Sequence, residues 1–155
     1  MSGINDVDNF YAADPNGVFI GYLGDEPISF ICAFKYVQNH GFIRLYLVKK
    51  KYRQKGYGLK IFNHAMKYLD GCNVGLNGVL PQIHHFERFG FKIYHSTQCF
   101  SIPGLNEIEE DPNIQQLKNI PFEQIREYHK SCTLTHSEEF TKKWISQDGA
   151  SIGYF

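Results

Sequence analysis

The chain has 155 residues, and 43% of them are hydrophobic, which is enough for one domain with a packed core. Its 16 basic and 16 acidic side chains cancel, so a protein that binds duplex nucleic acid over a wide basic face is not expected. The 4 cysteines are far apart and include no C-x-x-C pair, which predicts reduced thiols in the cytoplasm, without a disulfide framework or a metal site. No apolar run is long enough to span a membrane, and the first residues lack a signal-peptide pattern.

The first third of the chain predicts a β-hairpin and a further strand. Residues 1–16 are polar and poorly patterned, which is typical of a loose lead-in. Residues 18–23 and 28–35 are apolar and rich in β-formers, and the turn between them contains Gly24. Residues 42–48 follow a second turn and predict the third strand.

The basic turn over residues 49–58 carries the strongest functional signal. Five of the seven residues from 49 to 55 are lysine or arginine, and an amphipathic helix starts near Gly58. A turn between a strand and a helix leaves main-chain N–H groups unpaired at the positive end of the helix dipole. Gly56 and Gly58 have no side chains that would block a ligand. The turn therefore predicts a binding site for a pyrophosphate group.

Two common phosphate motifs do not fit this turn. No stretch has the G-x-x-x-x-G-K-[S/T] spacing of a P-loop, and Ile61 stands where the dinucleotide-binding motif G-x-G-x-x-G needs its third glycine. Two other interpretations stay open. Residues 49–55 can be a solvated charged turn, or a loop that binds nucleic acid or another protein.

The segment after the turn predicts two helices and three strands. The first helix ends near Gly71 and places four apolar side chains on one stripe, namely those of Leu59, Phe62, Met66 and Leu69. A short strand over residues 73–77 follows, and a second helix runs from about Pro81 to Gly90. Residues 91–95 and 98–102 predict a hairpin that closes the sheet.

The last third of the chain changes character. Residues 103–112 contain a proline–glycine pair and an acidic run, which is typical of a linker. Residues 113–155 then predict the order strand, helix, helix, strand.

Two motifs resemble those of the GNAT N-acetyltransferase superfamily. Residues 53–58, Arg-Gln-Lys-Gly-Tyr-Gly, are similar to its acetyl-CoA signature R/Q-x-x-G-x-G/A, and residues 86–91, Phe-Glu-Arg-Phe-Gly-Phe, are similar to its Y-E-K-x-G-F motif. The resemblance covers roughly residues 17–102, which would form the acetyl-CoA-binding core. It implies an α+β fold with a central mixed, mostly antiparallel sheet flanked by helices, and acetyl-CoA as cosubstrate without a metal.

The chain departs from this superfamily at its beginning. The superfamily fold opens with a strand and two helices, for which residues 1–16 leave no room. Residues 113–155 have that missing order of elements. They are therefore expected either to complete the core, within the chain or across a homodimer, or to begin a second domain that is truncated here.

The resemblance implies that the chain moves an acetyl group from acetyl-CoA to a primary amine of a small molecule or peptide by direct attack. The residues that would bind the cofactor are Leu47, Val48, Arg53, Gln54, Lys55, Gly56, Tyr57, Gly58 and Asn77. In many relatives the first tyrosine of Y-E-K-x-G-F protonates the leaving thiolate, but this chain has Phe86 there. His85 and Tyr94 are the candidates for that proton transfer.

Glu26 and His40 rank behind His85 and Tyr94 as possible bases, because both are expected in turns. The substitution at Phe86 leaves a second function open, a module that binds acyl-CoA without efficient transfer.

Overall fold

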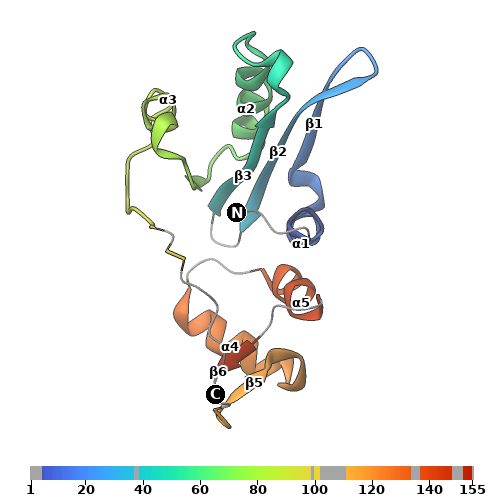
Figure 1. Ribbon diagram of the computed structural model, residues 1–155, viewed down its shortest axis with the longest axis vertical. Helices are drawn as coiled ribbons and strands as arrows, with labels where there is room; N and C mark the ends of the chain where they lie inside the picture. The colour runs from blue at the N-terminus through green and yellow to red at the C-terminus, as the bar shows by residue number, and fades with distance from the viewer. Residues whose placement is uncertain are drawn as a thin grey trace.

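The protein is described by a computed structural model. The described residues are 5–36, 39–98, 100–101, 111–133, 137–147 and 152–154. Their main body is a four-stranded sheet in the order β1-β2-β3-β4 (Figure 1). The strands are β1 (Val18–Leu23), β2 (Glu26–Tyr36), β3 (His40–Val48) and β4 (Asn73–Leu76). The first three are antiparallel, and β4 runs parallel to β3, so the predicted mixed, mostly antiparallel sheet is confirmed.

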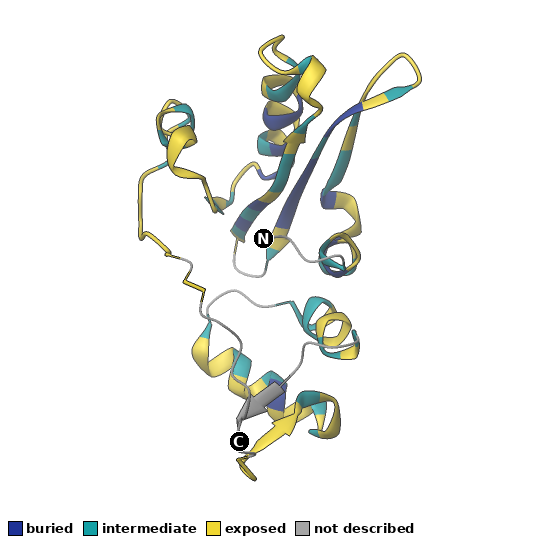
Figure 2. Ribbon diagram, viewed as in Figure 1, coloured by how far each residue is buried: buried dark blue, intermediate teal, exposed yellow. Residues whose placement is uncertain are grey.

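One face of the sheet is covered by α2 (Tyr57–Tyr68). This helix buries Ile61, Phe62, Ala65 and Leu69 against strand residues that include Ile31 and Ile43. The predicted stripe was therefore partly wrong, because Leu59 is 44% exposed and Ile61 and Ala65 take up the sheet-facing side instead. Figure 2 shows the buried residues concentrated on β2, β3 and the inner side of α2.

The short helix α3 (Ile83–Glu87) supplies aromatic side chains to the same core. Phe62 of α2 lies at their centre, with ring centroids 6.0 Å from Phe86, 4.7 Å from Phe89 and 6.3 Å from Phe91. The predicted second helix is thus present, preceded by a 3-10 turn over Leu80–Gln82.

The opposite face of the sheet carries a second apolar cluster. Alternate residues of a strand point to opposite faces, so Cys32 and Phe34 lie away from α2. They pack with Phe10, which comes from helix α1 (Asp6–Ala13) and is only 4% exposed. The expectation of a loose lead-in over residues 1–16 is therefore wrong for residues 6–13. Two adjacent buried residues, Asn9 and Phe10, hold this helix in place of a repeating apolar stripe.

The segment between α1 and β1 is fastened by the carboxylate of Asp14. It accepts hydrogen bonds from the main-chain N–H of Lys35 at 3.0 Å and from the hydroxyl of Tyr68 at 2.8 Å. Desolvation of the phenol and the bond to Asp14 raise the pKa of Tyr68 to about 12. These bonds tie the start of β1 to the end of β2 and to the last turn of α2.

The predicted closing hairpin is also wrong. Residues 91–98 and 100–101 form no strand, and beyond Phe91 their large side chains face solvent, with Tyr94 96% and Phe100 83% exposed. Cys99 and residue 102 lie outside the described residues. Among these described residues Phe91 alone packs on the core, so the others are not held against the outer edge of β4, where no described strand pairs.

The C-terminal segment has the predicted order of elements. It contains β5 (Ile114–Gln116), α4 (Phe122–Cys132), α5 (Glu138–Ser146) and β6 (Ile152–Tyr154), whereas the linker expected over 103–112 lies mostly outside the described residues. β5 pairs with β6 in a separate two-stranded sheet, so these strands do not complete the four-stranded sheet within the chain. The start of a second domain stays a prediction.

Helix α5 connects this segment to the main body by packing on α1 (Figure 1). The ring of Phe140 stacks on that of Phe10 with centroids 5.5 Å apart. The amide Nδ2 of Asn9 donates to Oε1 of Gln147 at 3.1 Å. The tail thus adds its own aromatic side chain to the cluster on the second face of the sheet.

Candidate functional site

The site begins with a β-bulge in β3. Phe30 pairs with Leu47 and Cys32 pairs with Arg44, so Leu45 and Tyr46 together lie opposite Ile31. Leu45 has a φ of 51°, a left-handed conformation that is rare for a residue with a branched side chain. The bulge shifts the side-chain alternation by one position. Tyr46 therefore packs on the α2 side, whereas Leu45 joins the cluster on the other face.

The bulge lies where β3 and β4 stop pairing. The parallel ladder ends at Ile43 and Leu76, but β3 continues beside β2 as far as Val48. In the described part of the chain, the β3 edge from residue 44 to residue 48 therefore has no strand on its β4 side. Leu47 on this stretch is 56% exposed. An open strand edge of this kind offers main-chain donors and acceptors to an extended ligand.

The turn after β3 points main-chain donors at one place. Gln54 and Gly56 have φ values of 60° and 82°, and α2 starts at Tyr57 directly after them. Within the described residues, the N–H groups of residues 54–59 have no hydrogen-bond acceptor; the first one satisfied is that of Lys60, which donates to Gly56 at 3.1 Å. These free donors lie at the positive end of the helix dipole, an arrangement that suits an anionic ligand.

The two glycines of the turn have different roles. Gly56 needs its positive φ, and a Cβ there would meet nothing within 4 Å. A Cβ on Gly58 would stand 2.7 Å from the hydroxyl oxygen of Tyr46 and 3.3 Å from Cγ2 of Val48. Gly58 thus lets the first turn of α2 approach β3, a packing role that the sequence did not reveal.

We predict that Gly58→Ala destabilises the fold by about 1–3 kcal/mol, because the rigid Tyr46 ring cannot give way without moving the helix. Adding Tyr46→Phe removes the atom in the closest contact and should recover part of the loss. Denaturant unfolding of the two single variants and the double variant measures this coupling. Additive losses would show that the helix does not rest on Tyr46.

The basic side chains of the loop are not equally available to a ligand. Lys49 and Lys51 pair with Glu26 at 3.2 and 2.9 Å, and Nε of Arg53 donates to the carbonyl oxygen of Val48 at 2.9 Å. Among the described residues, Lys55 forms no ion pair, and its Nζ lies 5.8 Å from the ring centroid of Tyr52. Lys55 is therefore the better placed of the expected cofactor-binding cations.

Glu26 does not fit its expected role as a base. It is the first residue of β2, and His40 is the first residue of β3, so neither lies in the turns expected for them. Hydrogen bonds from Tyr52, Lys51 and Lys49 lower the pKa of Glu26 to about 2. A carboxylate with this pKa is too weakly basic to take a proton from an alkylammonium.

The remaining expected site residues lie at three different places. Asn77 is exposed just after β4, and the His85 ring lies edge-on to Phe86 and Phe89 with centroids 5.6 and 5.3 Å away. Tyr94 is 96% exposed in an irregular segment, beside its neighbour His95. His85 is thus held by α3 next to the motif residue Phe86, whereas Tyr94 is not held near any expected site residue by a contact among the described residues.

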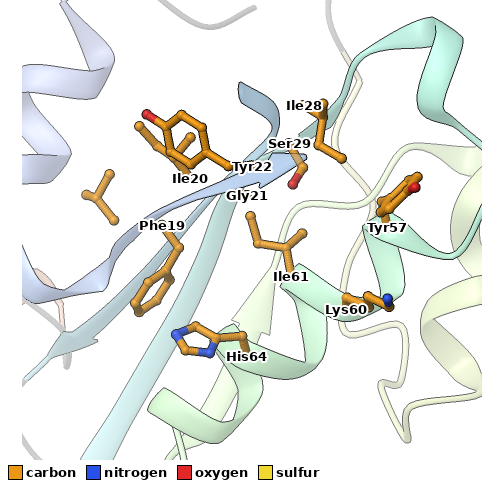
Figure 3. A pocket seen from close by; sticks show the side chains of 11 residues that line it. Phe19, Ile20, Gly21, Tyr22, Ile28, Ser29, Tyr57, Lys60, Ile61 and His64 are labelled. Carbon is orange, nitrogen blue, oxygen red and sulfur yellow. The ribbon is translucent and has the colours of Figure 1, made fainter. Parts of the chain in front are cut away.

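A groove of about 390 Å³ opens at the other edge of the sheet, between β1 and α2 (Figure 3). Phe19, Gly21 and Ile61 form its floor, and Lys60 and His64 line its helical side. The rings of Phe19 and His64 lie next to each other in Figure 3, in an edge-to-face contact with centroids 4.7 Å apart. Because β1 is separated from β3 by β2, this groove is distinct from the open β3 edge.

The described residues show neither a metal-binding cluster nor a membrane-spanning helix. They contain no group of three or more histidine, cysteine or acidic side chains that could hold a metal ion. None of their helices is long and apolar enough to cross a lipid bilayer.

Comparisons with known proteins agree with this geometry. The chain is 24% identical over 147 residues to a holothin acyltransferase of Pseudoalteromonas sp. (strain SANK 73390), covering 95% of this chain and 50% of that protein. Its fold resembles a putative acetyltransferase from Pyrococcus horikoshii, with a TM-score of 0.70 at 17% identity over 91% of this chain and 50% of the other. Ard1 from Thermoplasma volcanium gives a TM-score of 0.54 at 18% identity, over 61% of this chain and 68% of the other.

The chain spans about half the length of the first two of these relatives. Residues 3–91 match the acetyltransferase (GNAT) family, which is more than half of the chain and includes α1, the four-stranded sheet, the basic turn and α3. The chain therefore belongs to the GNAT acetyltransferase family.

Proposed function

We propose that this protein transfers an acetyl group from acetyl-CoA to a primary amine. The observation that carries the proposal is the set of unpaired N–H groups over residues 54–59, at the start of α2 and beside the open edge of β3. A diphosphate is the part of CoA that such a turn recognises best. Lys55 adds a positive charge next to these donors.

The open β3 edge suits the rest of the cofactor. The pantetheine arm carries two amides and can pair with main-chain groups between Val48 and Leu45, as an added strand would. The thioester would then lie near the bulge, where a main-chain N–H can polarise its carbonyl oxygen. Leu47 and Val48 keep the roles proposed for them, and Gly58 has a packing role in addition to the N–H that it presents.

The transfer itself needs two proton movements. An alkylamine with a pKa of about 10.4 must lose a proton before its nitrogen attacks the thioester carbon. The C–N bond then forms, the C–S bond breaks, and the further proton that the nitrogen must lose passes to the departing thiolate. Phe86 has no proton to give, and its ring packs against Phe62. We propose His85 for the second step, because α3 holds it directly before Phe86.

A second candidate function is an acyl-CoA-binding module without efficient transfer, which the apolar surroundings of Phe86 favour. A nucleic-acid-binding loop is less well supported. Glu26 pairs with both Lys49 and Lys51, so two of the five basic side chains of the loop already share an acidic partner.

Thiol release from acetyl-CoA tests the proposal. We expect release to depend on an amine and to rise about tenfold per pH unit below the pKa of that amine. The panel holds a polyamine, an amino sugar, a lysine peptide, a peptide with a free α-amine and holothin. A CoA-dependent rise in melting temperature without amine-dependent release would establish the binding module instead.

A further inference from the structure

We infer that Glu26 is a positioning residue for the diphosphate site, and that it acts by holding the loop before α2 in the conformation that presents its N–H groups. The inference rests on the proposed CoA site. Glu26 lies on β2, and its partners in the loop are 23 to 26 positions later in the chain. It belongs to the β1–β2 hairpin, and the described contacts of its carboxylate are with side chains of the loop.

Both oxygens of the Glu26 carboxylate are engaged by the loop. Oε1 accepts from Nζ of Lys49 at 3.2 Å and lies 2.9 Å from Nζ of Lys51, and Oε2 accepts from the hydroxyl of Tyr52 at 2.6 Å. The main chain adds a fastening next to them, because the N–H of Lys49 donates to the carbonyl of Ile28 at 2.9 Å. The hairpin therefore holds residues 49–52 in place, just before the residues with free N–H groups (54–59).

Tyr52 extends this contact to the helix. Its ring lies edge-on to that of Tyr57, the first residue of α2, with centroids 6.1 Å apart. The residues between the two rings include Gln54 and Gly56, whose left-handed conformations a free loop would have to adopt again at each binding event. A loop that is fixed beforehand avoids that entropic cost.

Charge and positioning predict opposite results when the Glu26 carboxylate is removed. Glu26 is an anion near a site for an anionic ligand, so electrostatics alone predicts tighter CoA binding without it, with Lys49 and Lys51 released. Positioning predicts weaker binding, because the loop loses its fastening. The sign of the change therefore decides between the two.

The test is titration calorimetry with CoA on the wild-type protein and on Glu26→Ala, Glu26→Gln and Asp25→Asn. Asp25 is the matched control, since it is an exposed acid in the same hairpin and the described residues give it no contact with the loop. We expect Glu26→Ala to raise the Kd about tenfold. The Kd of Glu26→Gln should lie between those of the wild-type protein and Glu26→Ala, because the new amide oxygen can still accept from Tyr52. Asp25→Asn should leave the Kd equal or lower.

The outcomes distinguish a merely structural role of Glu26, a failure of this inference and a failure of the proposed function. A merely structural role would lower the melting temperature of the unliganded Glu26→Ala protein but leave the Kd measured well below that temperature unchanged. An unchanged or lower Kd in Glu26→Ala, with CoA bound by the wild-type protein, would overturn the inference alone. If the wild-type protein binds no CoA, the proposed function fails, and the inference falls with it.

Discussion

Replacing Lys55 with glutamate is expected to raise the Kd for CoA by about 10- to 100-fold. The change turns a positive charge into a negative one beside the free N–H groups at the start of α2, and each unit charge is worth about 1 kcal/mol at 4 Å in water and more near a protein surface. Two units therefore correspond to roughly 2 kcal/mol, or about 30-fold in Kd. Titration calorimetry with CoA at low and high salt measures the effect.

Two features of this result make it specific. The loss should shrink at high salt, because Lys55 is exposed and its field is screened. Lys118→Glu is the control, because it makes the same change of net charge on an exposed residue of the C-terminal segment. Equal losses in the two variants would show that overall charge, rather than the turn, governs CoA binding.

Replacing Phe10 with alanine is expected to destabilise the fold by about 3–5 kcal/mol, the usual range for a buried phenylalanine. Its ring is 4% exposed and lies between Phe34, with centroids 4.9 Å apart, and Phe140, at 5.5 Å. The guanidinium of Arg44 sits over the same ring at 5.4 Å. Because domains of this size are stable by about 5–15 kcal/mol, the loss should be plain in denaturant unfolding.

Substitutions near Phe10 should cost less stability than Phe10→Ala and serve as comparisons for it. Phe140→Ala removes only the α5 side of the stack from a half-buried position and should cost about 1–2 kcal/mol. Val7→Ala, on the same helix but 45% exposed, should change stability by about 0.5 kcal/mol or less. A loss at Phe10 no greater than that at Val7 would mean that α1 does not pack on the sheet in solution.

The parts of the fold that the sequence predicted correctly are those set by local patterns. Alternating apolar residues and a glycine turn specify the β1–β2 hairpin, and a strand, a glycine-containing turn and an amphipathic stretch specify β3 and α2. By contrast, α1 was missed because its two buried residues, Asn9 and Phe10, have partners that lie far away in the sequence. Residues 91–101 are rich in β-formers, but whether they form a hairpin depends on a partner strand that no local pattern reveals.

In the candidate site, too, local features could be predicted from the sequence and contacts between distant residues could not. The turn could be recognised from its glycines and basic residues, since main-chain donors at a helix start follow from local geometry. The contacts of Glu26 could not, because they join residues more than 20 positions apart. The packing role of Gly58 depends on Tyr46, and the sequence gives no sign that a bulge turns Tyr46 toward the helix.

The extra residue in β3 changes which positions of this strand face α2. Before the bulge, the odd-numbered residue Ile43 faces α2. After the bulge, the even-numbered residue Tyr46 faces α2. A period-two hydrophobicity pattern carried through the strand thus assigns the inner and outer sides wrongly from there to the turn. If the same residues followed a regular strand without the bulge, Leu45 would face α2 and the Tyr46 ring would turn away from Gly58. The packing of α2 on β3 therefore depends on the number of residues in this strand as well as on their identity.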